Sequence, residues 1–210
     1  MITKLYIVRH TRTVGNDERR FTGRKDYEIT EEGKIYIQKL TDRLKEVKFD
    51  KMYSSTSGRA IKTIEPLAKL NGLEIETNEN LCEMYFGIYD GWKWEDVNKV
   101  NPKIDELHKE TNEIMEIPEQ ESTKEVANRV YNYIRAISIE NSGKVLLIAS
   151  HGIAIETFIR KVNNEEFTKN VEANSQKNTS VNIVEYDSEK DKFKVLLLND
   201  LSHLNQELER

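Results

Sequence analysis

Short apolar runs alternate along the chain with longer segments of helical spacing. The run LYIV, residues 5–8, is rich in β-formers, and KVLLIAS, residues 144–150, is nearly all apolar, which is typical of a parallel strand covered on both faces. Two further strand candidates are FDKMYSS, residues 49–55, and LEIETN, residues 73–78. The segments SVNIVEYD and KFKVLLLND predict a hairpin that turns across residues 188–191.

Helical signals separate these strand candidates. Thr30 is an N-cap, and the apolar positions that follow it recur at helical spacing as far as residue 47. A second helix is predicted over residues 57–70, where Pro66 should kink or redraw it. A capping box opens a third predicted helix over residues 122–140, and a fourth is predicted over residues 153–161.

The succession of strands and helices predicts an α/β fold. We expect a three-layer sandwich in which helices cover both faces of a mostly parallel central sheet. The chain shows no internal repeat, linker or low-complexity tract, so residues 1–210 should form a single domain. Residues 93–120 are charged, carry two of the three prolines and have weak helical periodicity. They predict a small helical cap inserted into that domain.

Composition narrows the functional classes. Apolar residues make up 37% of the chain and charged residues 33%, which predicts a densely charged surface around a modest interior. A net charge of −5 and a pI near 5.6 argue against a nucleic-acid partner. Cys82 is the sole cysteine, which excludes an internal disulfide and fits a reducing compartment. No apolar stretch reaches membrane-spanning length, so we expect a cytoplasmic protein without a membrane partner.

Two strand candidates end at a histidine, His10 in IVRH and His151 in LIASH. Ligands of open α/β sheets bind beyond the carboxyl ends of the strands, so the two imidazoles should converge at one rim. Arginines crowd the adjoining loops, and Arg59 begins the helix after another strand. Guanidinium groups and helix N-termini bind phosphate, and a neutral imidazole is a competent nucleophile. The pattern predicts a phosphoryl-transfer site, which also needs a carboxyl group as proton donor.

The motifs around these residues resemble those of the histidine phosphatase superfamily, the phosphoglycerate mutase-like family. The likeness covers nearly the whole chain, and no single motif carries it alone. The matching stretches are RHTRTVGN, FTGRKDYEITEEG, SSTSGRAIKT, LCEMYFGIYDGW, EQES, SHG and LNDLSHL.

The resemblance implies a role for each matched position. His10 would attack phosphorus and become a phosphohistidine, while Arg9, Arg59 and His151 surround the phosphoryl oxygens. Glu83 would protonate the leaving oxygen and then deprotonate the attacking water. The expected substrate-binding residues are Asn16, Thr22, Gly23 and Arg12. Neither a metal nor a cofactor is expected.

Two positions depart from the family pattern. Thr11 stands where the family has glycine, and a β-branched residue resists positive φ and brings a Cβ atom close to the phosphate loop. We therefore expect a reshaped pocket with altered selectivity or rate. Arg12 replaces an acidic or amide residue and predicts a substrate with a second anionic group.

Several other residues have simpler interpretations. Glu83 has a competing interpretation as an ordinary solvated carboxylate. His203, near the C-terminus, is expected to make a structural hydrogen bond. Cys82 is expected to be a small buried filler, and Trp92 and Trp94 are either pocket walls or core.

Three functions fit these residues. The preferred one is a metal-independent phosphomonoesterase that acts on small phosphorylated metabolites, because residues 95–120 lack the arginine pair that mutases of the family carry in an insertion there. The alternatives are a phosphoglycerate mutase-type phosphoryl transfer, which Thr22 in FTG favours, and a non-catalytic phosphate-binding regulatory module in which Thr11 has spoiled turnover. The expected partner is a small phosphorylated metabolite, with a homodimer as a possible assembly.

Overall fold

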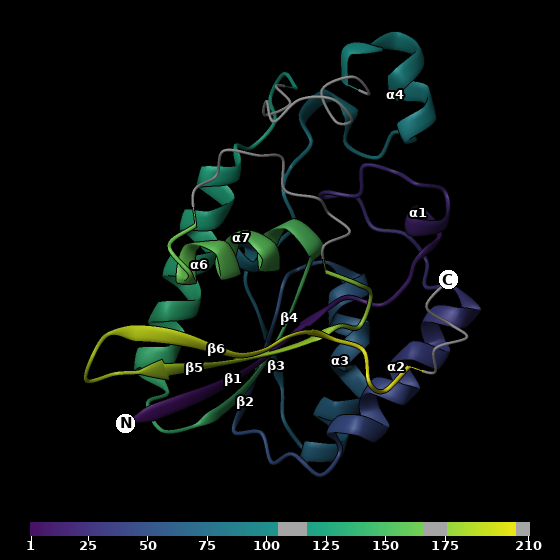
Figure 1. Cartoon of the computed structure of the whole chain (residues 1–210). Coiled ribbons are helices and arrows are strands. Elements are labelled where there is room, and N and C mark those ends of the chain that lie inside the picture. The colour runs from purple at the N-terminus through teal and green to yellow at the C-terminus, as the bar shows by residue number, and fades with distance from the viewer. Residues whose placement is uncertain (105–116, 166–175, 205–210) are drawn as a thin grey trace.

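The computed structural model describes residues 1–104, 117–165 and 176–204. Six strands form one sheet, namely β1 (Ile2–Arg9), β2 (Lys51–Ser54), β3 (Ile75–Thr77), β4 (Val145–Ser150), β5 (Val181–Asp187) and β6 (Lys192–Asp200). Their order is β3-β2-β4-β1-β5-β6 (Figure 1). The first four strands of that order are mutually parallel, while β5 and β6 continue the sheet antiparallel. The predicted mostly parallel sheet and the hairpin across residues 188–191 are both confirmed.

The described helices include the four predicted ones, which begin within one residue of their expected starts. The described helices are α1 (Val14–Asp17), α2 (Glu31–Leu44), α3 (Gly58–Asn71), α4 (Trp94–Val100), α6 (Thr123–Glu140) and α7 (Gly152–Val162), with 3₁₀ turns η1 (Glu79–Leu81) and η2 (Gly87–Tyr89). The Thr30 side chain accepts a hydrogen bond from Gly33 N, and Ser122 forms the predicted capping box with Glu125. Pro66 does not end α3, which continues to Asn71. No helix of the described ranges is long and apolar enough to cross a membrane.

Alternate side chains of the central strand β4 face opposite sides of the sheet, as strand geometry requires. Leu146 and Ile148 belong to one buried cluster, which also contains apolar residues of α6 and α7. Leu147 and Ala149 belong to a second cluster, formed with residues of α2 and α3. Each fully buried Leu or Ile contributes roughly 1.5–3 kcal/mol relative to an exposed one. The two clusters hold helices on both faces and produce the predicted three layers.

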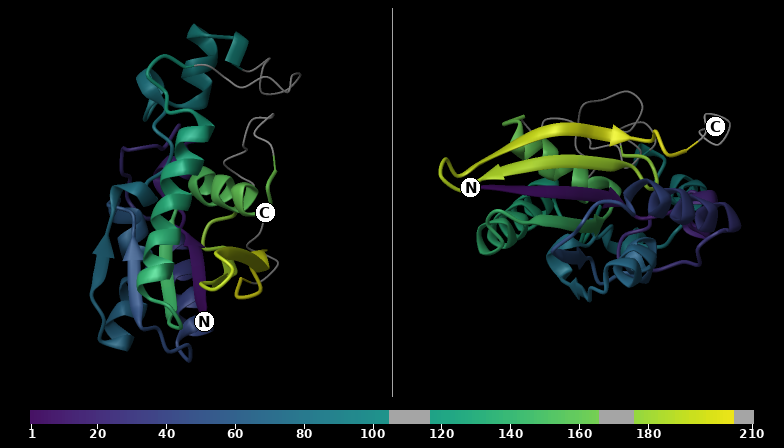
Figure 2. Two further views of the ribbon diagram at one scale, coloured as in Figure 1. Left: turned by 90° about the vertical axis from the view of Figure 1, so that its left-hand side faces the viewer. Right: turned by 90° about the horizontal axis from the view of Figure 1, so that it is seen from below.

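The helix α4 stands apart from the sheet, at the end of the molecule toward which β1 and β4 run (Figures 1 and 2). Just before α4, Lys93 forms an isolated β-bridge with Arg20. Trp94, the first residue of α4, stacks on Phe21 with ring centroids 4.9 Å apart, so this tryptophan packs against the core. Residues 105–116 of the predicted cap lie outside the described residues. The cap itself stays a prediction.

Candidate active site

Three neighbouring parallel strands end in polar residues at the same edge of the sheet. Ser55 follows β2, His151 follows β4 and His10 follows β1. Backbone hydrogen bonds from His10 N to Ser150 O (2.9 Å) and from Ser55 N to Ala149 O (3.0 Å) extend the ladders past the strand ends. The imidazole centroids of the two histidines are 5.1 Å apart, with 53° between the ring planes. The predicted convergence of the strand-end histidines is confirmed.

The surroundings of His10 determine which ring nitrogen is available for reaction. Its Nδ1 atom lies 2.7 Å from Thr11 O, and a carbonyl oxygen can only accept, so Nδ1 carries the proton. Burial, followed by the charges of Arg59 and Arg9, lowers the pKa of His10 well below its ordinary value. The ring is therefore neutral at pH 7, and its Nε2 atom keeps a lone pair that can attack an electrophile.

His151 holds its proton on the other nitrogen. Its Nδ1 atom lies 3.1 Å from Arg59 Nη2, and a guanidinium can only donate. Its Nε2 atom lies 2.7 Å from Ser55 Oγ and must be the protonated one, so the Ser55 hydroxyl accepts. Burial, and then the Arg59 charge, lowers the pKa of His151 well below its ordinary value. Ser55 is absent from the sequence-based site, although its place directly after a strand is the same signal that singled out the histidines.

Arg59 is fully enclosed by the turn that contains Thr22 and Gly23. Its Nη1 atom donates to Lys25 O (2.8 Å) and Asp26 Oδ1 (3.0 Å), and its Nη2 atom donates to Gly23 O (2.9 Å) and Thr22 O (3.4 Å). Its side chain has no solvent-exposed surface. The structure thus brings Thr22 and Gly23 to Arg59 through their carbonyl oxygens, and their contact with a substrate stays a prediction.

Arg9 is the second buried guanidinium beside the histidines. Its Nη1 atom donates to Gln176 O. Burial lowers the pKa of Arg9 to about 10, with the Glu83 carboxylate opposing the shift and the Arg59 charge adding to it, so Arg9 stays charged at pH 7. The Nε atoms of Arg9 and Arg59 are buried without a hydrogen-bond partner in the described part of the chain. Phosphoryl oxygens are acceptors that suit such donors.

Glu83 is buried, with 4% of its surface exposed, so its interpretation as a solvated carboxylate is wrong. Its Oε1 atom accepts from Met84 N (2.9 Å) and Ala154 N (3.1 Å), and its Oε2 atom accepts from Ile153 N (3.1 Å). Ile153 and Ala154 lie in the first turn of α7, where the helix dipole attracts a negative group. The carboxyl group is therefore held in one position and cannot swing freely.

Arg129 of α6 fixes the loop that carries Glu83. Its Nε and Nη2 atoms donate to the two carboxylate oxygens of Glu121 at 2.5 and 2.8 Å. Its Nη1 atom donates to Asn80 O (2.9 Å) and Cys82 O (2.7 Å), and Nη2 also donates to Glu83 O (3.1 Å). All five guanidinium N–H groups are thus used. Sequence reasoning missed Arg129, because three of its acceptors are backbone carbonyls 46 to 49 positions away.

Two asparagines back the segment that holds His10. Asn16 Oδ1 accepts from Thr13 N at 3.0 Å and from Asn178 Nδ2 at 3.4 Å. Asn178 Nδ2 also donates to His10 O at 3.0 Å. The structure therefore brings the predicted Asn16 next to the His10 segment. Asn178 was not predicted, and its only signal is a polar residue just ahead of the hairpin.

Thr11 is accommodated without positive φ, and its expected effect on the shape of the pocket stays a prediction. Its side chain is fully buried, and its hydroxyl donates to Gly33 O at 2.7 Å. Its backbone N–H donates to Thr63 Oγ1 at 2.9 Å. Thr11 is not among the residues with positive φ, so the strain expected of a β-branched residue does not arise.

Arg12 is engaged by acidic neighbours and is not brought to the histidines. Its Nε atom lies 2.6 Å from Asp17 Oδ1, and its Nη1 atom lies 2.6 Å from Glu32 Oε2. The hydrogen bond to Asp17 raises the pKa of Arg12. Within the described residues its guanidinium forms no hydrogen bond or ion pair with His10 or His151. Arg12 is thus paired with two carboxylates, and its expected contact with a second anionic group of the substrate stays a prediction.

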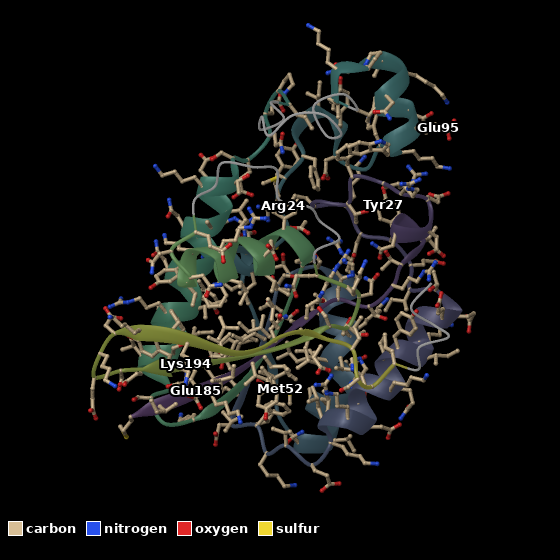
Figure 3. The ribbon with its side chains drawn as sticks, in the orientation of Figure 1. Arg24, Tyr27, Met52, Glu95, Glu185 and Lys194 are labelled. Carbon is tan, nitrogen blue, oxygen red and sulfur yellow. The ribbon has the colours of Figure 1, made fainter. Side chains whose placement is uncertain are left out.

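The assembled cluster combines a neutral imidazole with an unprotonated Nε2 atom, two buried guanidinium groups, a second imidazole and a fixed carboxyl group. These groups can bind a phosphoryl oxyanion, attack it and move a proton. No group of three or more His, Cys, Asp or Glu side chains is placed to hold a metal ion within the described residues. Figure 3 draws the side chains of the described residues.

Comparison with known proteins identifies the family. Putative phosphoserine phosphatase 2 of Hydrogenobacter thermophilus is 27% identical over 206 residues, which cover 97% of this chain and 98% of that protein. Phosphoglycerate mutase-like protein 4 of Arabidopsis thaliana is 28% identical over 207 residues, covering 97% and 87%. The structure of Bacillus stearothermophilus YhfR superposes with a TM-score of 0.87 at 28% identity, covering 96% and 98%. Residues 5–201 match the histidine phosphatase superfamily (branch 1), and the chain belongs to that superfamily.

Proposed function

We propose that the protein is a metal-independent phosphomonoesterase that hydrolyses small phosphorylated metabolites through a phosphohistidine on His10. The observation that carries the proposal is the hydrogen bond from His10 Nδ1 to Thr11 O, which leaves Nε2 as the free nucleophile of a neutral ring. Superfamily membership supports phosphoryl transfer as the reaction class. A relative named as a putative phosphoserine phosphatase supports a phosphorylated metabolite as substrate.

In the first step His10 Nε2 attacks phosphorus, and the bond from phosphorus to the ester oxygen breaks. Glu83 must carry a proton when the substrate binds, and it gives this proton to the leaving oxygen, so the alcohol departs neutral. Arg9 and Arg59 stabilise the charge on the transferring group, since both are buried and carry unpartnered Nε donors.

In the second step water replaces the alcohol. Glu83, now a carboxylate, takes a proton from the water, whose oxygen attacks phosphorus. The bond between phosphorus and Nε2 breaks, and phosphate leaves with the water oxygen. His10 regains its lone pair and Glu83 its proton, so the enzyme returns to its starting state.

Two alternatives differ from this proposal in the fate of the phosphoryl group. In a mutase a second hydroxyl of the substrate receives it, and the relative named as phosphoglycerate mutase-like favours that reaction. Against it stands the absence of arginine from residues 95–120 of the sequence. The absence of positive φ at Thr11 speaks against a regulatory module in which Thr11 has spoiled turnover.

The test is phosphate release in the presence of a chelator. The purified protein is incubated with p-nitrophenyl phosphate and with a panel of phosphorylated acids, sugars and nucleosides, beside the His10→Ala variant. The proposal predicts phosphate from the native protein and none from the variant. Interconversion of phosphoglycerates without phosphate release would establish the mutase instead, and neither reaction would leave the regulatory module.

A further inference from the structure

Arg24 spans two sides of the candidate active site. Its backbone belongs to the turn around Arg59, because the preceding carbonyl, Gly23 O, accepts from Arg59 Nη2 at 2.9 Å. Its guanidinium reaches the other side, where Nη2 lies 3.8 Å from Glu121 Oε2. Glu121 is bound by Arg129, which donates to the carbonyl of Glu83. The Arg24 side chain thus runs from the Arg59 side to the Glu83 side.

The backbone of Arg24 is held firmly while its side chain keeps donors to spare. Asp90 accepts from Arg24 N with both carboxylate oxygens at 3.2 Å, and also from Gly23 N at 3.0 Å. The guanidinium makes no hydrogen bond within the described residues, and 39% of the side chain is exposed. Figure 3 shows Arg24 between the levels of α7 and α4 in that view.

The ion pair with Glu121 contributes little stabilisation to the Arg24 side chain. Both oxygens of Glu121 are already bound by Arg129, at 2.5 and 2.8 Å, which leaves Arg24 at the longer distance of 3.8 Å. Partly exposed pairs of that length contribute little. Two other rim arginines are differently placed, since Arg12 pairs with two carboxylates and Arg20 donates to Glu18 and to a backbone carbonyl.

We propose that Arg24 determines substrate specificity by binding a carboxylate that the phosphomonoester carries a few bonds from its phosphate. This inference rests on the proposed function, with the phosphate beside His10. The two oxygens of a carboxylate match the guanidinium fork, and its single negative charge balances the single charge of Arg24. A second phosphate would bring about two negative charges close to Glu121. Arg24, and not Arg12, therefore supplies the second anion contact.

The test compares esters that differ only in the carboxylate. O-Phosphoserine and O-phosphoethanolamine form such a pair, and the ratio of their kcat/KM values reports recognition of that group. We expect the native protein to prefer phosphoserine, and Arg24→Gln to lower the ratio by about 10- to 100-fold, as loss of a charge-assisted hydrogen bond implies. Arg12→Gln is the matched control and should keep the native ratio. An unchanged ratio in Arg24→Gln, or a fall confined to Arg12→Gln, would overturn the proposal.

Two further arms separate the possible failures. Binding of both esters to His10→Ala, with and without Arg24→Gln, is measured by calorimetry and gives the same ratio without turnover. If the native protein hydrolyses neither ester, the proposed function is contradicted. The ratio of the two binding constants then still decides the role of Arg24. Fructose 1,6-bisphosphate against fructose 6-phosphate tests the second-phosphate alternative. A preference for the bisphosphate that depends on Arg24, without one for phosphoserine, would contradict the carboxylate assignment.

Discussion

The imidazoles of His10 and His151 lie 5.1 Å apart and carry their protons on opposite ring nitrogens. Thr11 O fixes the proton of His10 on Nδ1, whereas Arg59 and Ser55 fix that of His151 on Nε2. The proposed role of His10 as nucleophile requires this protonation state. The unprotonated Nδ1 atom of His151 accepts from Arg59, whose guanidinium should bind the phosphoryl group.

This pair of tautomers can be observed directly. Nitrogen-15 NMR of the imidazoles should show one ring protonated at Nδ1 and one at Nε2. Because the pKa values of both rings are lowered, neither should titrate near pH 6.5. Ser55→Ala should change the His151 signals and leave the His10 pattern in place, while Thr56→Ala from the same loop should change neither. Titration of the His10 and His151 rings near pH 6.5 would contradict the assignment.

Replacing Glu83 with Gln removes the proton donor and keeps the shape of the side chain. We expect turnover of alkyl phosphates to fall by about 10²- to 10⁴-fold, the usual contribution of general acid–base catalysis. p-Nitrophenyl phosphate should be less affected, because its leaving group needs little protonation. Steady-state rates for the two substrate types provide the comparison, and equal slowing of both would count against Glu83 as the acid.

The Arg129 contacts predict a loss of both stability and positioning in Arg129→Met. The substitution leaves three loop carbonyls and Glu121 without their charged donor, which should lower the free energy of unfolding by about 2–4 kcal/mol. Arg129→Lys keeps the charge without the planar fork and should recover only part of that loss. Urea unfolding measures the stability. Rates on alkyl phosphates should fall as well, since the Glu83 loop is released. An unchanged free energy of unfolding in Arg129→Met would contradict this role of Arg129.

Acid should destabilise the fold through its buried histidines. In the unfolded chain a histidine takes up a proton as the pH falls below about 6.5, whereas His10 and His151 resist protonation in the folded state. The unfolded state then binds more protons, so stability is intact above pH 6.5 and declines below it. Burial, and then the Arg43 charge, lowers the pKa of His203 to about 4, against the pull of Asp200.

The substitution His203→Gln isolates the contribution of His203, the third histidine with a lowered pKa, to the pH dependence of stability. It should flatten the decline in the free energy of unfolding between about pH 6.5 and 4, the window set by the unfolded and folded pKa values of His203. Urea unfolding at several pH values provides the measurement. Parallel profiles for the variant and the native protein would contradict the assigned shift. In the fold His203 lies 3.0 Å from Arg43 Nη1 and 3.3 Å from Thr179 Oγ1, consistent with its predicted structural role.

The site residues that follow a regular strand or helix pattern are the easiest to predict from the sequence. His10 and His151 follow apolar runs, and parallel strands that end at one edge bring them together without further information. Glu83 lies outside the regular strands and helices, between the turns η1 and η2, so only the family resemblance singles it out. Pro66 shows that residue propensity alone does not predict where a helix ends. The helix α3 continues past it, and Ile64 and Leu67 are buried in the core.

Charge is harder to interpret from the sequence than strand and helix pattern. Arg12 and Arg24 look alike as rim cations, yet Arg12 is neutralised by Asp17 and Glu32, and Arg24 is not fully paired. The difference arises partly from contacts with residues distant in the chain, since Arg12 pairs with Glu32 and Arg24 lies near Glu121. Thr11 shows the same limit, since the acceptor of its hydroxyl, Gly33 O, belongs to α2.

The central claim is a covalent phosphoryl group on His10, and trapping that group tests it most directly. Native protein is mixed with an excess of substrate, quenched in alkali within the first turnovers and digested for mass spectrometry. We predict one phosphoryl group on the peptide that contains His10, stable in alkali and lost in acid, and none in the His10→Ala protein. Substrate turnover with no phosphoryl group on His10, or with the label on another residue, would contradict the account.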